Sequence, residues 1–191
     1  MRPMKYRRLE KSIRLLGLGQ RGFTIMELML TILVLGILLG LSVPMFRETM
    51  LNNRIVASNN EFISGLNYAR SEAIKRSDTV TVCPSTNGAT CAASTNWSTG
   101  WIVFADLNAD GALTGGELGP TQPMQIGPAT TDGITINSPT VQFVRYSASG
   151  MLLGGAAGTF SLLKTGCTGN TARQIGVSVT GRVSTIKVAC P

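Results

Sequence analysis

A long apolar segment near the N-terminus constrains the fold of this chain more than any other feature of its sequence. Between Phe23 and Val43, Glu27 is the only charged residue. An α-helix of this length would cross a bilayer core of about 30 Å at about 1.5 Å per residue. A carboxylate inside such a segment is costly and usually has a partner. The sequence therefore predicts a membrane-spanning helix over residues 23–43, in which Glu27 has a specific role.

The distribution of charge predicts how this segment is oriented. The chain of 191 residues has a formal net charge of +7, and most of that charge lies in residues 1–22. Beside Glu10, this segment holds the basic residues Arg2, Lys5, Arg7, Arg8, Lys11, Arg14 and Arg21. A basic segment directly before an apolar span stays on the cytoplasmic side of a membrane. We therefore expect the rest of the chain outside the cytoplasm, and the basic composition does not by itself indicate nucleic-acid binding.

Two simpler interpretations of the N-terminus are a cleaved secretory signal and a plain signal anchor. A secretory signal has a shorter apolar core followed by small residues at the cleavage site. Here the apolar run continues past Pro44 into a helical pattern. The sequence thus argues against a secretory signal. A plain anchor stays open, although it leaves the position of Glu27 unexplained.

The helix is predicted to continue beyond the apolar segment. After Pro44, apolar residues recur at the spacing of one buried helical face, at Leu51, Ile55, Phe62, Leu66, Ala69 and Ala73. Because this periodic sequence follows the proline, we expect Pro44 to bend the helix rather than to end it. The predicted organisation is a span over residues 23–43, an amphipathic helix over 44–76 and a globular head over 77–191.

The head is predicted to be rich in β-structure. Runs of β-branched and aromatic residues occur at Thr79–Cys83, Gly100–Ala105, Thr140–Tyr146, Thr159–Leu163, Gln174–Thr180 and Val183–Val188. Clusters of Gly, Pro, Asn, Ser and Thr separate these runs. Since no helical pattern lies between them, we expect an antiparallel sheet covered by the amphipathic half of the helix, which makes an α+β fold.

Cysteine usage agrees with an exported head. All four cysteines, Cys83, Cys91, Cys167 and Cys190, follow the apolar segment, and an even number in an oxidising compartment indicates two disulfides. Three pairings are possible, and we favour Cys83–Cys91 and Cys167–Cys190. A metal site is the weaker alternative, because the chain has no C-x-x-C pair and no histidine.

The lack of histidine also argues against enzymatic activity. No Ser-His or Cys-His pair can form, and neither a G-x-S-x-G motif nor a G-x-x-x-x-G-K-[ST] phosphate-binding loop occurs. We therefore expect a protein that is not an enzyme and that uses no cofactor.

A group of acidic residues after the second predicted strand has two interpretations. Asp106, Asn108, Asp110 and Glu117 occupy the first, third, fifth and twelfth places of the Ca²⁺-loop pattern D-x-[DN]-x-[DN]-G-x5-E. A strand precedes this group and Leu118-Gly119-Pro120 follows it, instead of the two helices that flank such loops. Asp and Asn also build tight turns through side-chain hydrogen bonds without any ion. The sequence favours an ion-free turn and leaves calcium binding as the alternative.

The junction Gly22-Phe23-Thr24-Ile25-Met26-Glu27-Leu28 resembles the processing site of type IV prepilins and type II secretion pseudopilins. In those proteins a prepilin peptidase cuts after the glycine and methylates the new amino terminus, which here would be that of Phe23. The resemblance implies that residues 1–22 are a cleaved leader. It also implies that Glu27 pairs with the amino terminus of a neighbouring subunit during assembly.

Further matches narrow the resemblance to the group of minor pilins and pseudopilins that contains FimT, FimU and GspH. Gly36 and Pro44 match positions where the family commonly has glycine and proline, and we expect the helix to bend at them. The head matches at Leu66-Asn67-Tyr68-Ala69-Arg70-Ser71-Glu72-Ala73, Val82-Cys83-Pro84-Ser85, Gly100-Trp101-Ile102-Val103-Phe104 and Gly181-Arg182-Val183. The resemblance implies a single-pass protein of the bacterial inner membrane, with a periplasmic head, that assembles with major and minor pilins in a type IV pilus. A pseudopilin of a type II secretion system is the alternative.

Some FimT-like minor pilins bind DNA for uptake through a C-terminal G-R-x-R motif. Here Gly181-Arg182-Val183-Ser184 keeps the first arginine and has serine in place of the second. We expect Gly181 in the turn of a hairpin that exposes Arg182, with Arg173 and Lys187 on the flanking strands. Three cations would then be placed to contact phosphates, although solvated charge on a hairpin is the simpler interpretation.

Overall fold

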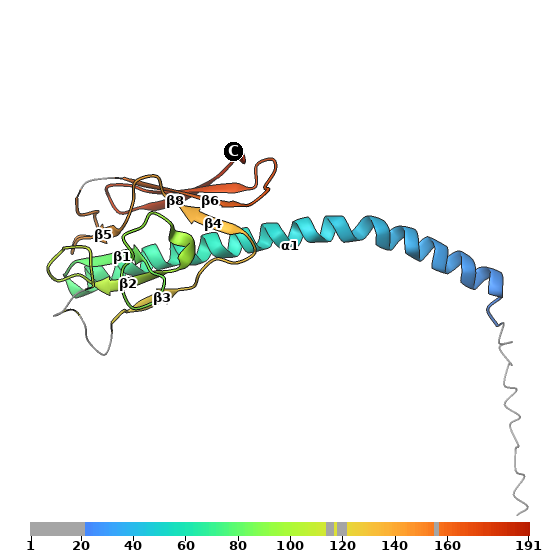
Figure 1. Cartoon of the computed structure of the whole chain (residues 1–191), viewed down its shortest axis with the longest axis horizontal. Helices are drawn as coiled ribbons and strands as arrows, with labels where there is room; N and C mark the ends of the chain where they lie inside the picture. The colour runs from blue at the N-terminus through green and yellow to red at the C-terminus, as the bar shows by residue number, and fades with distance from the viewer. Residues whose placement is uncertain (1–21, 114–116, 118–121, 155–156) are drawn as a thin grey trace, which may run out of the picture. The chain divides into compact units, whose positions relative to one another are not determined.

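The computed structural model describes residues 22–113, 117, 122–154 and 157–191. Helix α1 (Ile25–Arg76) precedes a head built from strands and a short 3₁₀ helix, η1 (Trp97–Thr99), as Figure 1 shows. The strands are β1 (Val80–Pro84), β2 (Trp101–Ala105), β3 (Gln125–Gly127), β4 (Ile134–Asn137), β5 (Val144–Tyr146), β6 (Gly158–Lys164), β7 (Ala172–Val177) and β8 (Val183–Val188). Apart from Gly22, the leader predicted for residues 1–22 lies outside the described residues.

The chain divides into two compact units, Met1–Met45 and Phe46–Pro191. The α1 backbone is helical through Gly36 and Pro44, and the bend expected at these two residues stays a prediction. Within the part of the chain that the structure describes, no helix is long and apolar enough to cross a membrane. The span expected over residues 23–43 is therefore not confirmed.

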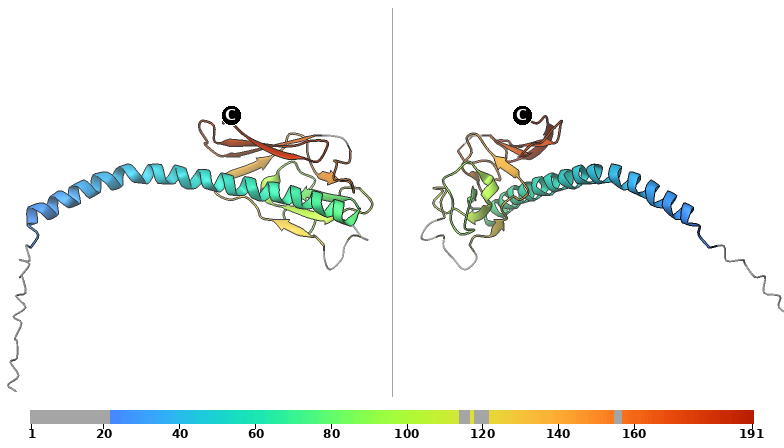
Figure 2. Two further views of the ribbon diagram at one scale, coloured as in Figure 1. Left: turned by 180° about the vertical axis from the view of Figure 1, so that it is seen from behind. Right: turned by 45° about the vertical axis from the view of Figure 1, so that its right-hand side comes forward.

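The head contains two antiparallel sheets rather than the single sheet expected. Their strand orders are β3-β2-β1-β5 and β4-β6-β7-β8. Figures 1 and 2 show the C-terminal part of α1 lying against both of them. This arrangement confirms an α+β fold in which a long N-terminal helix packs on antiparallel sheets.

The six predicted β-runs correspond to β1, β2, β5, β6, β7 and β8, whereas β3 and β4 were not predicted. Strand β3 has only three residues and pairs with β2, with Gly127 opposite Trp101. Strand β4 pairs with β6, and its two isoleucines, Ile134 and Ile136, are buried. Strand β3 is too short to carry a β-signal of its own, so its pairing with β2 decides that it forms. In β4 the β-branched run Ile134-Thr135-Ile136 was a local signal that the sequence analysis missed.

One core joins α1 to both sheets. Helix α1 contributes the buried residues Ile55, Phe62, Leu66, Ala69 and Ala73, which are members of the predicted apolar face. The Phe62 ring lies edge-on to the rings of Trp97, Trp101 and Phe160, at centroid distances of 5.4, 6.2 and 5.1 Å. This aromatic cluster, which draws on the helix and both sheets, lies in the core of the head.

Trp101 fits between two glycines. A Cβ atom added to Gly65 on α1, or to Gly127 on β3, would overlap the indole ring of Trp101. The ring is only 3% exposed. The helix can therefore approach the β3-β2-β1-β5 sheet at this point only because both neighbours lack a side chain.

The β3-β2-β1-β5 sheet has a second, smaller core on its other face. It consists of Cys83, Ile102, Phe104 and Leu113, with Cys91 packed against it. Because both faces are covered, β1 and β2 are buried at every position instead of alternating.

Two disulfides close loops of the head. Cys83 is bonded to Cys91 after β1, and Cys167 in the β6–β7 connection is bonded to Cys190 at the end of the chain. These are the two pairs favoured from the sequence. The second bond connects the last residues to the β4-β6-β7-β8 sheet.

Candidate functional site

The first turn of α1 is capped by Thr24. The Glu27 backbone N–H donates a hydrogen bond to Thr24 Oγ1 at 3.2 Å, and the Leu28 N–H donates to the Thr24 carbonyl oxygen at 3.1 Å. Threonine at the cap with glutamate three residues later is a capping-box sequence, and a carboxylate in the first turn also interacts favourably with the helix dipole. Sequence reasoning missed the capping role of the Thr24 side chain, although the Thr-x-x-Glu signal was present.

The beginning of α1 exposes apolar side chains at consecutive positions. Phe23 is 74% exposed. The exposed residues that follow are Ile25, Met26, Leu28, Met29, Leu30, Ile32, Leu33, Val34, Leu35, Ile37, Leu38, Leu39 and Leu41. Consecutive positions cover every side of a helix, so this segment has no polar face. The processing role of Gly22 and Phe23 and the assembly role of Glu27 stay predictions.

The turn between β7 and β8 has the conformation that the sequence predicts. Gly181 has a φ of 76°, and its N–H donates to the Ser178 carbonyl oxygen at 2.8 Å. A Cβ on Gly181 would overlap the carbonyl oxygen of Gly150. The fold therefore requires glycine here, whether or not the hairpin binds a ligand. Arg182 follows directly and is exposed.

Arg70 on α1 holds this turn in place. Its Nε donates to the Gly150 carbonyl oxygen at 2.9 Å, and its Nη2 donates to the Thr180 carbonyl oxygen at 3.1 Å. One guanidinium thus binds both the connection between β5 and β6 and the β7–β8 turn. The arginine of the Leu66–Ala73 motif has a structural function that sequence reasoning did not foresee.

The end of α1 carries a local ion-pair group. Glu72 accepts hydrogen bonds from Arg76 Nε at 2.8 Å and from Lys75 Nζ at 3.2 Å. The bond from Arg76 holds the pKa of the Glu72 carboxyl below its ordinary value. Basic residues in the last turn also interact favourably with the helix dipole. This group therefore stabilises the last turns of α1.

The structure does not bring three exposed cations together at the hairpin. Arg173 lies directly opposite Lys187 and is only 7% exposed. It shares the core-facing side of β7 with Ile175 and Val177, because side chains alternate along a strand. Its Nη1 is buried and has no hydrogen-bond partner among the described residues. Arg173 is therefore inaccessible to a phosphate, which corrects the expected set of contacts.

Arg182 and Lys187 remain as the exposed cations of the predicted set. Lys187 lies five residues further along the chain, which corresponds to about 17 Å on a strand. They would contact separate phosphates rather than clamp one group.

The acidic loop, defined here as Asp106, Asn108, Asp110 and Glu117, begins where β2 ends. The Asp106 side chain is fully buried. Its Oδ2 accepts hydrogen bonds from Thr81 Oγ1 at 2.6 Å, from the Gly111 N–H at 3.0 Å and from Arg145 Nε at 3.1 Å. Its Oδ1 is buried and has no hydrogen-bond partner within the described residues.

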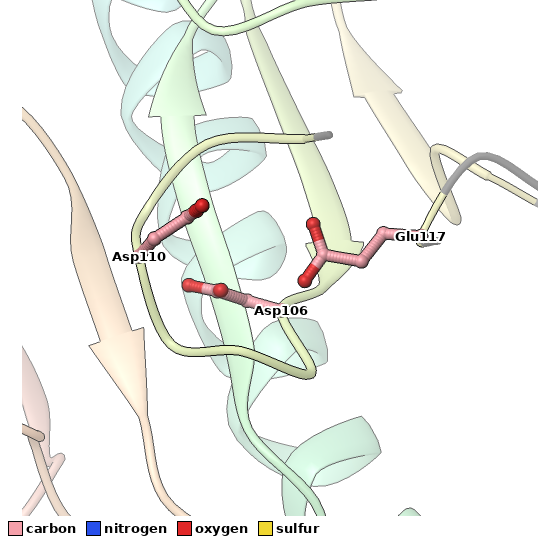
Figure 3. A group of neighbouring side chains, drawn as sticks. All are labelled: Asp106, Asp110 and Glu117. Atoms are coloured by element: carbon pink, nitrogen blue, oxygen red, sulfur yellow. The ribbon is translucent and has the colours of Figure 1, made fainter. Parts of the chain in front are cut away.

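The other members of the acidic loop surround Asp106. The Asp110 N–H donates to Asn108 Oδ1 at 3.0 Å, and the Asn108 N–H donates to Glu117 Oε1 at 3.3 Å. Carboxylate oxygens of Asp106, Asp110 and Glu117 lie within 4.8 Å of one another. Figure 3 shows the Glu117 carboxylate directed toward the part of the loop that carries the two aspartates. The structure thus brings together the four residues singled out in the sequence.

Comparisons with known proteins give a consistent result for the head. The sequence model of a family described as type II transport protein GspH matches residues 58–181. No curated protein matches the chain. The matched segment includes the part of α1 from Ser58 to Arg76, strands β1 to β7 and the turn at Gly181.

Three solved structures are similar. The type IV minor pilin FimU of Pseudomonas aeruginosa (strain PAO1) in space group P21 has a TM-score of 0.54 at 21% identity, covering 69% of this chain and 87% of that one. Its P65 form has a TM-score of 0.51 at 21% identity, covering 68% and 90%. The minor pseudopilin EpsH from the type 2 secretion system of Vibrio cholerae has a TM-score of 0.46 at 12% identity, covering 69% and 94%. The likeness to FimU supports the fold of the head.

Proposed function

Because the chain belongs to the GspH family of type II transport proteins, we propose that it is a minor type IV pilin, a structural subunit that assembles into or primes a pilus. The fold shared with the minor pilin FimU supports this choice. A minor pseudopilin of a type II secretion system is the second candidate, which the description of the family favours. Both are filament subunits, and neither is an enzyme.

The exposed apolar beginning of α1 is the observation that carries this proposal. A helix that is apolar on every side is normally buried, either in protein or in lipid. Between Phe23 and Leu41 every residue is exposed. We propose that the inner membrane covers this segment before assembly, with the head in the periplasm, and that equivalent helices of other pilins cover it afterwards.

Processing and assembly would depend on two residues in this segment. A prepilin peptidase that removes residues 1–22 would create a positively charged amine on Phe23. In the dry interior of a helical bundle, an unpaired amine and an unpaired carboxylate are both costly. Pairing Glu27 with the amine of a neighbouring subunit would remove both costs together.

We expect Gly22→Ala to leave the leader attached and Glu27→Gln to reduce incorporation into filaments. Glutamine serves as well as glutamate at the third position of a capping box, so Glu27→Gln keeps the helix cap and removes only the charge. The measurement is mass spectrometry of the N-terminal peptide, together with immunoblots of sheared filaments from a piliated strain that expresses the full chain. The native chain should begin at an N-methylated Phe23.

Glu61→Gln is the matched control, because Glu61 is an exposed carboxylate on α1 outside the apolar segment. Assembled filaments that still contain residues 1–22, or normal incorporation of Glu27→Gln, would contradict the proposal. Deletion of the gene separates the two candidates. Loss of surface pili indicates a minor pilin, whereas periplasmic accumulation of secreted proteins indicates a pseudopilin.

DNA binding for uptake is a further candidate activity of the same subunit. It rests on Arg182, which is exposed beside a turn to which Arg70 donates a hydrogen bond. Lys187 adds a second exposed cation, whereas Arg173 is buried. Such contacts would be indifferent to base sequence, because phosphates carry no sequence information.

We expect weak DNA binding with a small salt dependence. Two neutralised phosphates give a log–log salt slope of about −1.8, so a rise from about 50 to about 200 mM salt should weaken binding about twelvefold. A gel shift with the purified chain measures this slope. Arg182→Gln should flatten it by about one unit, and Ser184→Arg, which restores a G-R-x-R pattern, should strengthen binding.

Arg173→Gln serves as the control and should leave the slope unchanged. If neither the native chain nor Ser184→Arg binds DNA at low salt, the hairpin has only a structural role.

A further inference from the structure

The two carboxylate oxygens of Asp106 have different surroundings. Oδ2 accepts three hydrogen bonds, from Thr81, Gly111 and Arg145. Oδ1 is equally buried and accepts none from the described residues. Buried polar atoms are rarely left without a partner, and a carboxylate oxygen is especially costly to desolvate. The orphaned oxygen therefore indicates a ligand, and its negative charge indicates a cation.

The neighbouring oxygens supply the rest of a cation site. One oxygen each of Asp106, Asp110 and Glu117 lies within 4.8 Å of the other two, and Asp106 and Glu117 are both buried. Carboxylates that share a site repel one another unless a positive charge lies among them. We propose that the acidic loop binds one Ca²⁺ ion, with Asp106 Oδ1 as a ligand.

Arg145 does not compete for this position. Its Nε is bonded to Asp106 Oδ2, and its guanidinium lies 4.7 Å from the centre of the Phe143 ring. The arginine is therefore held on the opposite oxygen of the same carboxylate. Asp106 is arranged to receive two positive charges, one on each oxygen.

The donor set selects the chemical class of the ion. All the side-chain donors are carboxylate or amide oxygens, which suits a hard cation and not zinc, which prefers nitrogen and sulfur. Ca²⁺ accepts six to eight oxygens in flexible geometry, whereas Mg²⁺ usually keeps several waters and needs a nearly ideal octahedron. A loop that offers several oxygens from one short segment thus favours Ca²⁺.

The loop geometry is compatible with this ion. The four side chains stand at the first, third, fifth and twelfth places of the Ca²⁺-loop pattern, and Gly111 stands at the sixth with a φ of 83°. A Cβ on Gly111 would come within 2.8 Å of Arg145 Nη2. Glycine at this place therefore allows both the turn and the approach of the arginine.

Calcium binding would fix the loop to the β3-β2-β1-β5 sheet. Asp106 directly follows β2 and is already bonded to Thr81 of β1 and Arg145 of β5. An ion that also holds Asp110 and Glu117 would connect the loop to three strands at once. We therefore expect Ca²⁺ to stabilise the folded head.

The test is isothermal titration of the full chain in detergent, first with CaCl₂ and then with MgCl₂, after removal of metal with EDTA. We expect one Ca²⁺ per chain with a Kd of about 10⁻⁴–10⁻³ M, the range of extracellular calcium modules. At about 10 mM Ca²⁺ the ratio of folded to unfolded chain should then rise about 10- to 100-fold, seen as a higher denaturation midpoint. Asp110→Asn and Glu117→Gln should each weaken binding by about tenfold or more, because fewer charged ligands lower the affinity.

Glu61→Gln, which changes an exposed carboxylate outside the acidic loop, should bind Ca²⁺ like the native chain. Three results would overturn the proposal. The first is that about 10 mM Ca²⁺ does not stabilise the chain. The second is that Asp110→Asn and Glu117→Gln leave the Kd for Ca²⁺ unchanged. The third is that Mg²⁺ binds as tightly as Ca²⁺.

Discussion

Gly65→Ala should destabilise the head by about 1–3 kcal/mol, although the same change in an ordinary helix interior stabilises by about 0.5–1 kcal/mol. The added methyl group would overlap the indole ring of Trp101. The ring has no room to move away, because Gly127 lies against it and the Phe62 ring packs edge-on to it. Urea denaturation followed by circular dichroism measures the effect. Gly127→Ala should act in the same direction.

Ser64→Ala is the matched control, since Ser64 is the exposed neighbour of Gly65 on the same helix. It should change stability by only a few tenths of a kcal/mol, because exposed substitutions away from special features have small effects. In a Trp101→Leu background the destabilisation by Gly65→Ala should shrink, because the smaller side chain leaves space for the methyl group. Equal effects in both backgrounds would show that the clash with Trp101 is not the cause.

Removing the disulfide between Cys167 and Cys190 should cost about 3–4 kcal/mol. The two cysteines are 23 residues apart, and in the chain-entropy model the cost grows with the length of the closed loop. Neither side chain is in the core, so replacing both by alanine changes little besides the cross-link. The free energy of unfolding of the double variant, measured in urea, gives the value.

The bond between Cys83 and Cys91 provides the comparison. It closes a shorter loop, with a separation of eight residues, and chain entropy alone predicts a loss of about 2.5 kcal/mol. Thr168→Ala, an exposed change beside Cys167, should stay within about 0.5 kcal/mol of the native chain. A Cys167→Ala/Cys190→Ala variant as stable as this control would show that the bond does not restrain the unfolded chain as the model requires.

The sequence predicts most of the secondary structure because the relevant signals are local. The apolar period that begins at Leu51 and ends at Ala73 identifies the buried face of α1, and β-branched runs identify the longer strands. It does not predict that there are two sheets, because strand pairing depends on contacts between distant segments. A strand as short as β3, which has no β-branched run, forms only when such a partner is present.

In the acidic loop, too, the local grouping of residues was predictable from the sequence, whereas the long-range contact was not. The Ca²⁺-loop pattern in the sequence was enough to predict that Asp106 and Glu117 lie close together, because a loop of this length can close on itself. The partner Arg145 was not predicted, because it reaches Asp106 only through the pairing of β1 with both β2 and β5. The burial of Arg173 was predictable, however, because it shares the parity of Ile175 and Val177 along β7.

The two hydrogen bonds of Arg70 affect how the head opens. Amide hydrogen exchange in folded proteins occurs through local openings, and segments that open together form one cooperative unit. A fluctuation that withdraws the Arg70 guanidinium releases the carbonyl oxygens of Gly150 and Thr180 in the same event. We therefore expect the β5–β6 connection and the β7–β8 turn, although distant in the chain, to open together. We expect any change in α1 that displaces the Arg70 side chain to shift the opening of both segments together.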